Sequence, residues 1–181
     1  SMTSPKLLNL PNALTISRLI AVPFCCYALF KNGGDDNFWR IIAWAGFFLV
    51  GLTDFFDGKI ARSRRQITNF GIFLDPVADK VAIGAAMIGL SMQGKLLWWV
   101  TILILVREVS VTILRLTVIR DGVIPASKGG KLKAAFQSFG VGFYILPLPT
   151  WLHLPRDIFM AVAILLTITT GFDYFKKVFK K

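Results

Sequence analysis

Residues 54–79 read DFFDGKIARSRRQITNFGIFLDPVAD and place four aspartates inside an otherwise apolar part of the chain. On a helix, which turns by about 100° per residue, Asp54 and Asp57 lie about 60° apart, and Asp75 and Asp79 about 40° apart. We therefore expect two carboxylate pairs on two consecutive helices, able to face each other across a helical hairpin. Because four clustered like charges repel strongly in a low dielectric, such a group needs bound cations or protonated carboxyls.

The chemistry of this cluster favours hard divalent metals. Carboxylates without histidine or thiolate partners are ligands for Mg²⁺, Mn²⁺ or Ca²⁺ and argue against zinc. Two pairs indicate two ions, an arrangement suited to phosphoryl transfer, in which the ions neutralise a pyrophosphate and the charge on its leaving oxygen. Gly58, Ala61 and Gly71 would let a nucleotide approach the backbone. Arg62 supplies a planar guanidinium that can donate hydrogen bonds to a phosphate. Salt bridges to Arg62 or Lys80 would explain one or two of the carboxylates, but not all four.

The composition indicates a membrane protein. Of the 181 residues, 55% are hydrophobic, and the mean hydropathy is +0.62. The chain thus contains more apolar residues than a soluble domain of this size could bury. Each of six apolar stretches approaches the roughly 20 residues that a spanning helix needs. They cover residues 13–30, 41–61, 71–92, 96–119, 134–150 and 156–175. We expect an all-α integral membrane protein with six transmembrane helices, a short interfacial segment at residues 5–12, and a single domain over residues 1–181.

The basic residues indicate how the helices are oriented. The formal net charge is +11, with 21 Lys and Arg against 10 Asp and Glu. If both termini are cytoplasmic, only four basic residues fall on the opposite side, namely Lys31, Arg40, Lys95 and Arg156. By the positive-inside rule we expect both termini and the aspartate cluster on the cytoplasmic side of the cell membrane. Anionic lipid headgroups or an anionic substrate suit this charge, whereas no soluble domain is left to bind nucleic acid.

A second polar group follows the aspartates. Arg107 and Arg115, eight residues and about two helical turns apart, lie within an apolar stretch and can point inward from one face. Such a group could hold a second phosphate. A cytoplasmic cluster that only orients the helices explains Lys128 and Lys133 equally well, but it does not explain the two arginines. The whole group comprises Arg107, Glu108, Arg115, Ser127, Lys131, Lys133 and Gln137.

The aspartate and glycine pattern resembles the signature of the CDP-alcohol phosphotransferase family. The defining positions are all present at the expected spacing: Asp54, Asp57, Gly58, Ala61, Arg62, Gly71, Asp75 and Asp79. The flanking sequence resembles family members that use sn-glycerol 3-phosphate as the acceptor. The matching residues there are Asn9-Leu10-Pro11-Asn12-x-Leu14-Thr15-x-x-Arg18 with Pro23, Arg107-Glu108, Arg115 and Gly130-Lys131-x-Lys133. The likeness therefore covers nearly the whole chain.

The resemblance implies a six-helix membrane enzyme, usually homodimeric, whose site opens to the cytoplasm between the second and third helices. It implies that two Mg²⁺ or Mn²⁺ ions bind Asp54, Asp57, Asp75 and Asp79. The implied CDP-binding residues are Asp54, Asp57, Gly58, Ala61, Arg62, Gly71 and Asp75. Asp79 is the implied general base, which would take the proton of the acceptor hydroxyl. That hydroxyl would attack the β-phosphate of CDP-diacylglycerol and release CMP.

The resemblance also assigns the second polar group to the acceptor. The implied phosphate-binding residues are Arg107, Arg115, Lys131 and Lys133, with Glu108, Ser127 and Gln137 in support. One position departs from the family pattern. Ala134 stands where the members that use glycerol 3-phosphate commonly carry threonine, so a hydroxyl contact there is lost or made elsewhere.

Two kinds of alternative stay open. Within the family, inositol phosphate would also bring a phosphate to the basic group, whereas serine would not use it, and phosphatidylglycerol is a further candidate acceptor. From another class of protein, the four carboxylates could be the coupling site of a cation transporter. A transporter would not need Gly58, Ala61 and Arg62 at a fixed spacing, and it would not release CMP from CDP-diacylglycerol.

Overall fold

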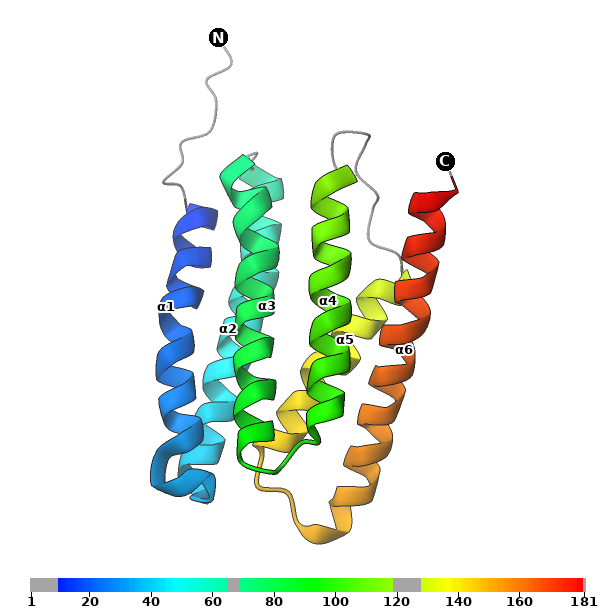
Figure 1. The fold of residues 1–181 in the computed structure, drawn as a ribbon. Helices are drawn as coiled ribbons and strands as arrows, with labels where there is room; N and C mark the ends of the chain where they lie inside the picture. Colours follow the sequence, from blue (N-terminus) through cyan, green and yellow to red (C-terminus); the bar gives the residue numbers. More distant parts are fainter. Residues whose placement is uncertain (1–9, 65–68, 119–127, 181) are drawn as a thin grey trace. The chain divides into compact units, whose positions relative to one another are not determined.

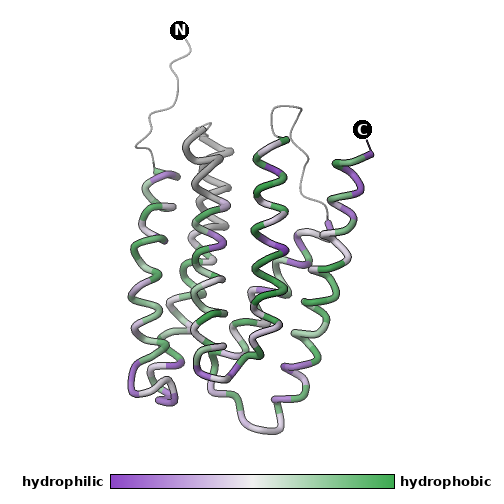
Figure 2. Tube along the Cα trace, in the orientation of Figure 1, coloured by the Kyte–Doolittle hydropathy of each residue, from purple (hydrophilic) through white to green (hydrophobic). Residues whose placement is uncertain are grey.

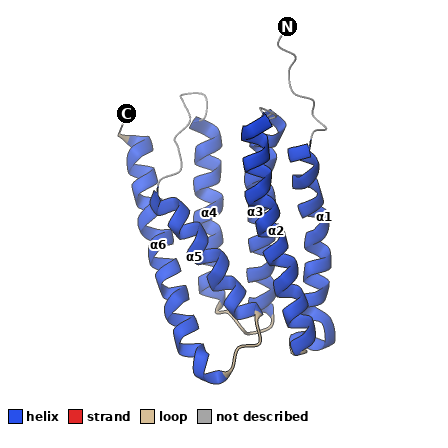
Figure 3. Cartoon of the chain, turned by 180° about the vertical axis from the view of Figure 1, so that it is seen from behind, coloured by secondary structure: helices blue, strands red, loops and turns tan. Residues whose placement is uncertain are grey.

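The computed structural model of the chain describes residues 10–64, 69–118 and 128–180, and of residues 11, 54–64 and 69–75 it describes the backbone alone. This part of the chain is helical and contains no strand, as Figure 3 shows. The α-helices are α1 (Leu10–Phe30), α2 (Asn37–Arg64), α3 (Asn69–Met92), α4 (Trp98–Val118), α5 (Lys128–Ile145) and α6 (His153–Phe179), with 3₁₀ turns η1 (Lys31–Gly34) and η3 (Thr150–Leu152). Each of the six expected apolar stretches overlaps one of these helices, although the stretch 134–150 runs past the end of α5 at Ile145, and the all-α prediction is confirmed (Figure 1).

The chain divides into two compact units, Ser1–Gly89 and Leu90–Lys181. In the first unit, α1 packs against α2, and a tight turn joins the two helices. Three successive residues of this turn have positive φ: Asn32 at 54°, Gly33 at 78° and Gly34 at 82°. Glycine and asparagine adopt this left-handed conformation at the lowest cost, which is why the sequence Asn-Gly-Gly can reverse the chain here.

Asp36 fixes the start of α2. Its Oδ1 accepts a 3.0 Å hydrogen bond from the backbone N–H of Phe38, and its Oδ2 accepts a 2.7 Å bond from the side-chain amide of Asn32. The backbone carbonyl of Asp36 also accepts from the N–H of Arg40 at 2.9 Å. This is the hydrogen-bonding pattern of a helix N-cap, and it links the cap directly to the preceding turn.

Small residues bring the helices of the first unit close together. A Cβ at Gly46 of α2 would lie 2.8 Å from the Sγ of Cys25 on α1. A Cβ at Gly89 of α3 would lie 2.8 Å from Cδ2 of Leu29. Real Cβ atoms do not approach other heavy atoms this closely, so a side chain at either position would displace Cys25 or Leu29.

In the second unit, α6 packs against both α4 and α5. Phe159 of α6 stacks on Phe136 of α5, with ring centroids 4.5 Å apart, and meets Phe143 edge-on at 5.1 Å. At the turn between these helices, the hydroxyl of Tyr144 donates a 2.5 Å hydrogen bond to Oδ1 of Asp157. Aromatic packing along the helices and a hydrogen bond at the turn thus hold α5 and α6 together.

Two described segments are long and apolar enough to cross a membrane, Asn12–Gly34 and Thr150–Phe179. Figure 2 shows apolar residues along much of α1 and through the middle of α6, with hydrophilic residues near both ends of α6. Several large apolar side chains of α6 are exposed, including Leu154, Leu165 and Phe172. Charged residues interrupt the apolar run in α4 and α5, at Arg107 and Glu108 and at Lys131 and Lys133. The sixfold spanning arrangement therefore stays a prediction, as does the interfacial segment, of which residues 5–9 lie outside the described part.

Candidate functional site

The backbone confirms that the four aspartates occupy two consecutive helices. Asp54 and Asp57 belong to α2, and Asp75 and Asp79 belong to α3. Their helical spacing of three and four residues places each pair on one side of its helix. The side chains of Asp54, Asp57 and Asp75 lie outside the described residues, as do those of Gly58, Ala61, Arg62 and Gly71. That the two aspartate pairs face each other thus stays a prediction.

Asp79 is the one aspartate of the cluster whose side chain is described. It is 53% exposed, and its Oδ2 lies 3.3 Å from Nζ of Lys80, the next residue. No group of three or more His, Cys, Asp or Glu side chains that could hold a metal occurs among the described side chains, a set that excludes three of the four aspartates. The accessible carboxylate of Asp79 fits an oxygen-only site for hard divalent ions, and the adjacent ammonium is a counter-charge that such an ion would replace.

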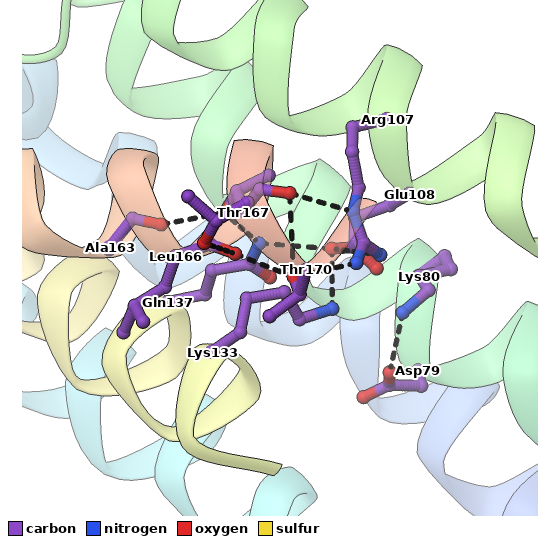
Figure 4. A network of polar contacts seen from close by, with 11 residues as sticks. Asp79, Lys80, Arg107, Glu108, Lys133, Gln137, Ala163, Leu166, Thr167 and Thr170 are labelled. Carbon is purple, nitrogen blue, oxygen red and sulfur yellow. Dashed lines mark hydrogen bonds and ion pairs between the residues drawn. The ribbon is translucent and has the colours of Figure 1, made fainter. Parts of the chain in front are cut away.

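In the second unit, the buried carboxylate of Glu108 on α4 accepts hydrogen bonds from side chains of α4 and α5. Glu108 is 2% exposed, and its Oε1 accepts three hydrogen bonds (Figure 4). The donors are Nζ of Lys133 at 2.6 Å, Nε2 of Gln137 at 3.0 Å and Nη1 of Arg107 at 3.3 Å. A buried charge is tolerated only when paired and hydrogen-bonded, and here two cations share one anion. Among the described side chains, Glu108 is thus a carboxylate that Arg107 and Lys133 share.

The side chain of Arg107 extends from α4 onto α6. Its Nε donates a 3.1 Å hydrogen bond to the backbone carbonyl of Thr167, and its Nη2 donates a 2.9 Å bond to Oγ1 of Thr170. The hydroxyl of Thr167 accepts a further 2.8 Å hydrogen bond from Nε2 of Gln137, so α6 contacts the polar side chains of both α4 and α5. A Cβ at Gly171 would lie 3.2 Å from Nε of Arg107, which shows how closely the guanidinium lies against the α6 backbone.

The remaining members of the predicted acceptor group lie in different settings. Arg115 is exposed, and its guanidinium carbon lies 5.2 Å from the ring centroid of Tyr174 on α6, a cation–π contact. Lys131 is exposed on the first turns of α5, whereas Lys133 is buried against Glu108. Ser127 lies outside the described residues. The structure thus brings together Arg107, Glu108, Lys133 and Gln137, and it places Arg115 against α6.

The polar contributions of α6 were not predicted from the sequence. Thr167, Thr170 and Tyr174 take part in the contacts of Arg107, Gln137 and Arg115, yet they lie in a helix that the sequence indicated only as an apolar span. Threonines in such a helix commonly bond to their own backbone, which hides a second role. The one available signal was the spacing of 167, 170, 171 and 174, which defines a single polar and small-residue face.

Known proteins resemble this chain over most of its length. The family model described as CDP-alcohol phosphatidyltransferase matches residues 8–169 of the chain. A Mycobacterium tuberculosis protein described as a probable phosphatidylglycerophosphate synthase is 54% identical over 169 residues, which is 93% of this chain and 81% of that protein. The CDP-diacylglycerol–glycerol-3-phosphate 3-phosphatidyltransferase of Bacillus subtilis is 37% identical over 183 residues, 93% of this chain and 94% of that protein. The enzyme of that name from Haemophilus influenzae is 33% identical over 172 residues, 92% of this chain and 91% of that protein.

Proposed function

Because the chain belongs to the CDP-alcohol phosphatidyltransferase family, we propose that it transfers the phosphatidyl group of CDP-diacylglycerol to sn-glycerol 3-phosphate. The products are phosphatidylglycerophosphate and CMP. One observation carries this proposal: every aspartate, glycine and arginine of the family pattern is present at residues 54–79, on the consecutive helices α2 and α3. The names of the bacterial relatives support glycerol 3-phosphate as the acceptor.

The aspartates of α2 and α3 supply the donor half of the site. Asp54, Asp57, Asp75 and Asp79 would hold two divalent ions, Mg²⁺ or Mn²⁺, which neutralise the pyrophosphate of the donor and the charge on the departing CMP. Gly58, Ala61, Arg62 and Gly71 would line the surface against which the CDP moiety lies.

Asp79 would act on the acceptor hydroxyl. Its exposed carboxylate would accept the hydroxyl proton while the acceptor oxygen bonds to the β-phosphorus of CDP-diacylglycerol. The bond between that phosphorus and the oxygen bridging to the CMP phosphate breaks, so the electron pair leaves with CMP.

The basic residues of α4 and α5 would hold the acceptor phosphate. Arg107, Arg115, Lys131 and Lys133 form this group, and Glu108, Gln137 and Ser127 support it. Two basic side chains, Arg107 and Lys133, meet at the buried Glu108, and they support a phosphate-bearing acceptor. Inositol phosphate would meet the same charges, so acceptor identity needs a direct test.

The membrane arrangement belongs to the proposal as well. We place all six helices across the cell membrane, with both termini and the site on the cytoplasmic side, in one domain that functions as a homodimer. The apolar segments Asn12–Gly34 and Thr150–Phe179 support membrane insertion, and the family match extends across both compact units.

The test is CMP release by the purified protein in detergent with CDP-diacylglycerol and Mg²⁺ or Mn²⁺. Glycerol 3-phosphate, inositol phosphate, serine and phosphatidylglycerol are offered separately. Release with glycerol 3-phosphate alone supports the proposal, and release with another acceptor keeps the chemistry but changes the acceptor. No release with any acceptor, from folded and metal-loaded protein, would favour the transporter alternative.

A further inference from the structure

The α6 face made of Thr167, Thr170 and Gly171 meets Arg107 in a way that leaves part of its guanidinium unused. Arginine has five N–H donors. Nε bonds to the Thr167 carbonyl, Nη1 to Glu108 and Nη2 to the Thr170 hydroxyl. One N–H on each terminal nitrogen therefore has no partner among the described residues. Two N–H groups on adjacent nitrogens of a planar guanidinium are suited to binding a phosphate with two hydrogen bonds.

Two features of the α6 face and one residue of α4 fix the orientation of that guanidinium. The Thr167 carbonyl accepts from Nε. The Thr170 hydroxyl accepts from Nη2 and donates within α6 to the carbonyl of Leu166 at 2.5 Å, with the carbonyl of Thr167 at 3.4 Å. Gly171 offers no side chain, so the guanidinium can lie against the backbone. Glu108 holds the opposite edge through Nη1. The side chain of Arg107 is 15% exposed, so most of its rotamers are excluded by packing.

We propose that Thr170, with Gly171, is a positioning residue of the phosphatidyltransferase: it orients Arg107 for the phosphate of the acceptor without touching the substrate itself. This inference rests on the proposed function. It extends the acceptor site to α6, a helix that contributed no residue to the site predicted from the sequence. Because an unaligned guanidinium binds phosphate as a point charge only, loss of the Thr170 hydroxyl weakens acceptor binding and leaves the donor half of the reaction unchanged.

Thr170→Val removes the hydroxyl with little change in side-chain volume. We expect the KM for glycerol 3-phosphate to rise about tenfold, the effect of losing one hydrogen bond to a charged group. The kcat and the KM for CDP-diacylglycerol stay within about twofold. Thr170→Ser keeps the hydroxyl and restores the acceptor KM. Gly171→Ala, with all hydroxyls present, also raises the acceptor KM because its Cβ would lie 3.2 Å from Nε of Arg107.

Thr169→Val is the matched control. Thr169 is exposed, and its hydroxyl bonds only within α6, to the carbonyls of Leu165 at 3.0 Å and Leu166 at 3.4 Å. The control should leave all kinetic constants unchanged while losing the same chemical group from the adjacent position.

The outcomes separate this inference from the proposed function. If wild-type protein releases no CMP with glycerol 3-phosphate, the proposed function fails and this inference falls with it. If wild-type protein is active and Thr170→Val leaves the acceptor KM unchanged, the positioning role alone is overturned. Two further results would overturn it in favour of a purely structural role. One is an equal rise in the KM for CDP-diacylglycerol and for glycerol 3-phosphate in Thr170→Val. The other is the loss of the thermal unfolding transition in Thr170→Val, if Thr170→Ser does not restore that transition.

Discussion

Lys133 on α5 donates a 2.6 Å hydrogen bond to Glu108 on α4, and both side chains are buried, with 8% and 2% exposure. Removing either charge alone leaves the other buried in a low-dielectric setting without its main counter-charge. Removing both leaves no member of the pair as an uncompensated charge. The pair therefore couples the stability of the second unit to the residues proposed to bind the acceptor.

Glu108→Gln should destabilise the protein. The substitution keeps the side-chain volume but removes the anion that Lys133 and Arg107 share, at an expected cost of about 3 kcal/mol. A lower midpoint of thermal unfolding in detergent would report this loss. Adding Lys133→Met should recover part of it, and an undiminished loss in the double variant would contradict the coupling.

Asp79→Asn should abolish turnover while retaining the nucleotide site. An amide cannot accept the hydroxyl proton, but it keeps an oxygen toward a divalent ion. We expect CMP release to fall at least about a hundredfold, with CDP still raising the thermal unfolding midpoint in the presence of Mg²⁺. Equal loss of turnover and of CDP-dependent stabilisation would assign Asp79 to binding rather than to proton transfer.

Lys131→Ala should weaken binding of the acceptor. Lys131 is exposed on α5, so its removal leaves the Glu108 network in place and costs little stability. The KM for glycerol 3-phosphate should rise several-fold, with the KM for CDP-diacylglycerol unchanged. Lys128→Ala, which removes another exposed lysine from the same end of α5, is the control and should leave both constants near their wild-type values.

Chelation of divalent ions should stop the reaction reversibly. Four carboxylates without nitrogen or sulfur ligands favour hard ions, so Mg²⁺ or Mn²⁺ should restore CMP release after treatment with a chelator. Binding of CDP, followed as a shift in thermal unfolding, should disappear and return in parallel. CMP release that persists in full after complete removal of metal would contradict the assignment of the four aspartates.

Tyr144→Phe should lower stability without changing kinetics. The substitution removes the hydrogen bond to Asp157 at the turn between α5 and α6, and Arg156, which lies 4.2 Å from the centroid of the Tyr144 ring, keeps its aromatic contact. We expect a loss of about 1 kcal/mol, seen as a lower thermal midpoint. A changed KM for either substrate would show that this turn communicates with the site.

The helices and the placement of the aspartates could be predicted because both depend on local information. Long apolar stretches specify helices by themselves, and three- and four-residue spacings place Asp54 with Asp57 and Asp75 with Asp79 on α2 and α3. The turn at residues 32–34 follows equally from its own residues, since Asn-Gly-Gly supplies three positive φ angles.

The role of α6 could not be predicted, because it depends on which face of the helix meets its neighbours. Residues 167–170 read Thr-Ile-Thr-Thr, and each of the three threonines can satisfy its hydroxyl on its own helix. Only packing against α4 and α5 shows that Thr167 and Thr170 also reach Gln137 and Arg107, whereas Thr169 is exposed. The central position of Glu108 likewise arises from tertiary contacts with Lys133 and Gln137, more than twenty residues away in sequence.

The cation–π contact between Arg115 and Tyr174 and the exposure of Lys131 bear on how acceptor choice could diverge among related enzymes. Arg107 and Lys133 are bound to the buried carboxylate of Glu108, so replacing either of them for a new acceptor is expected to cost stability. Arg115 and Lys131 carry no such constraint in the described contacts. Evolutionary change of the alcohol that this scaffold accepts is therefore expected to begin at these two positions, with Glu108 and its partners held fixed.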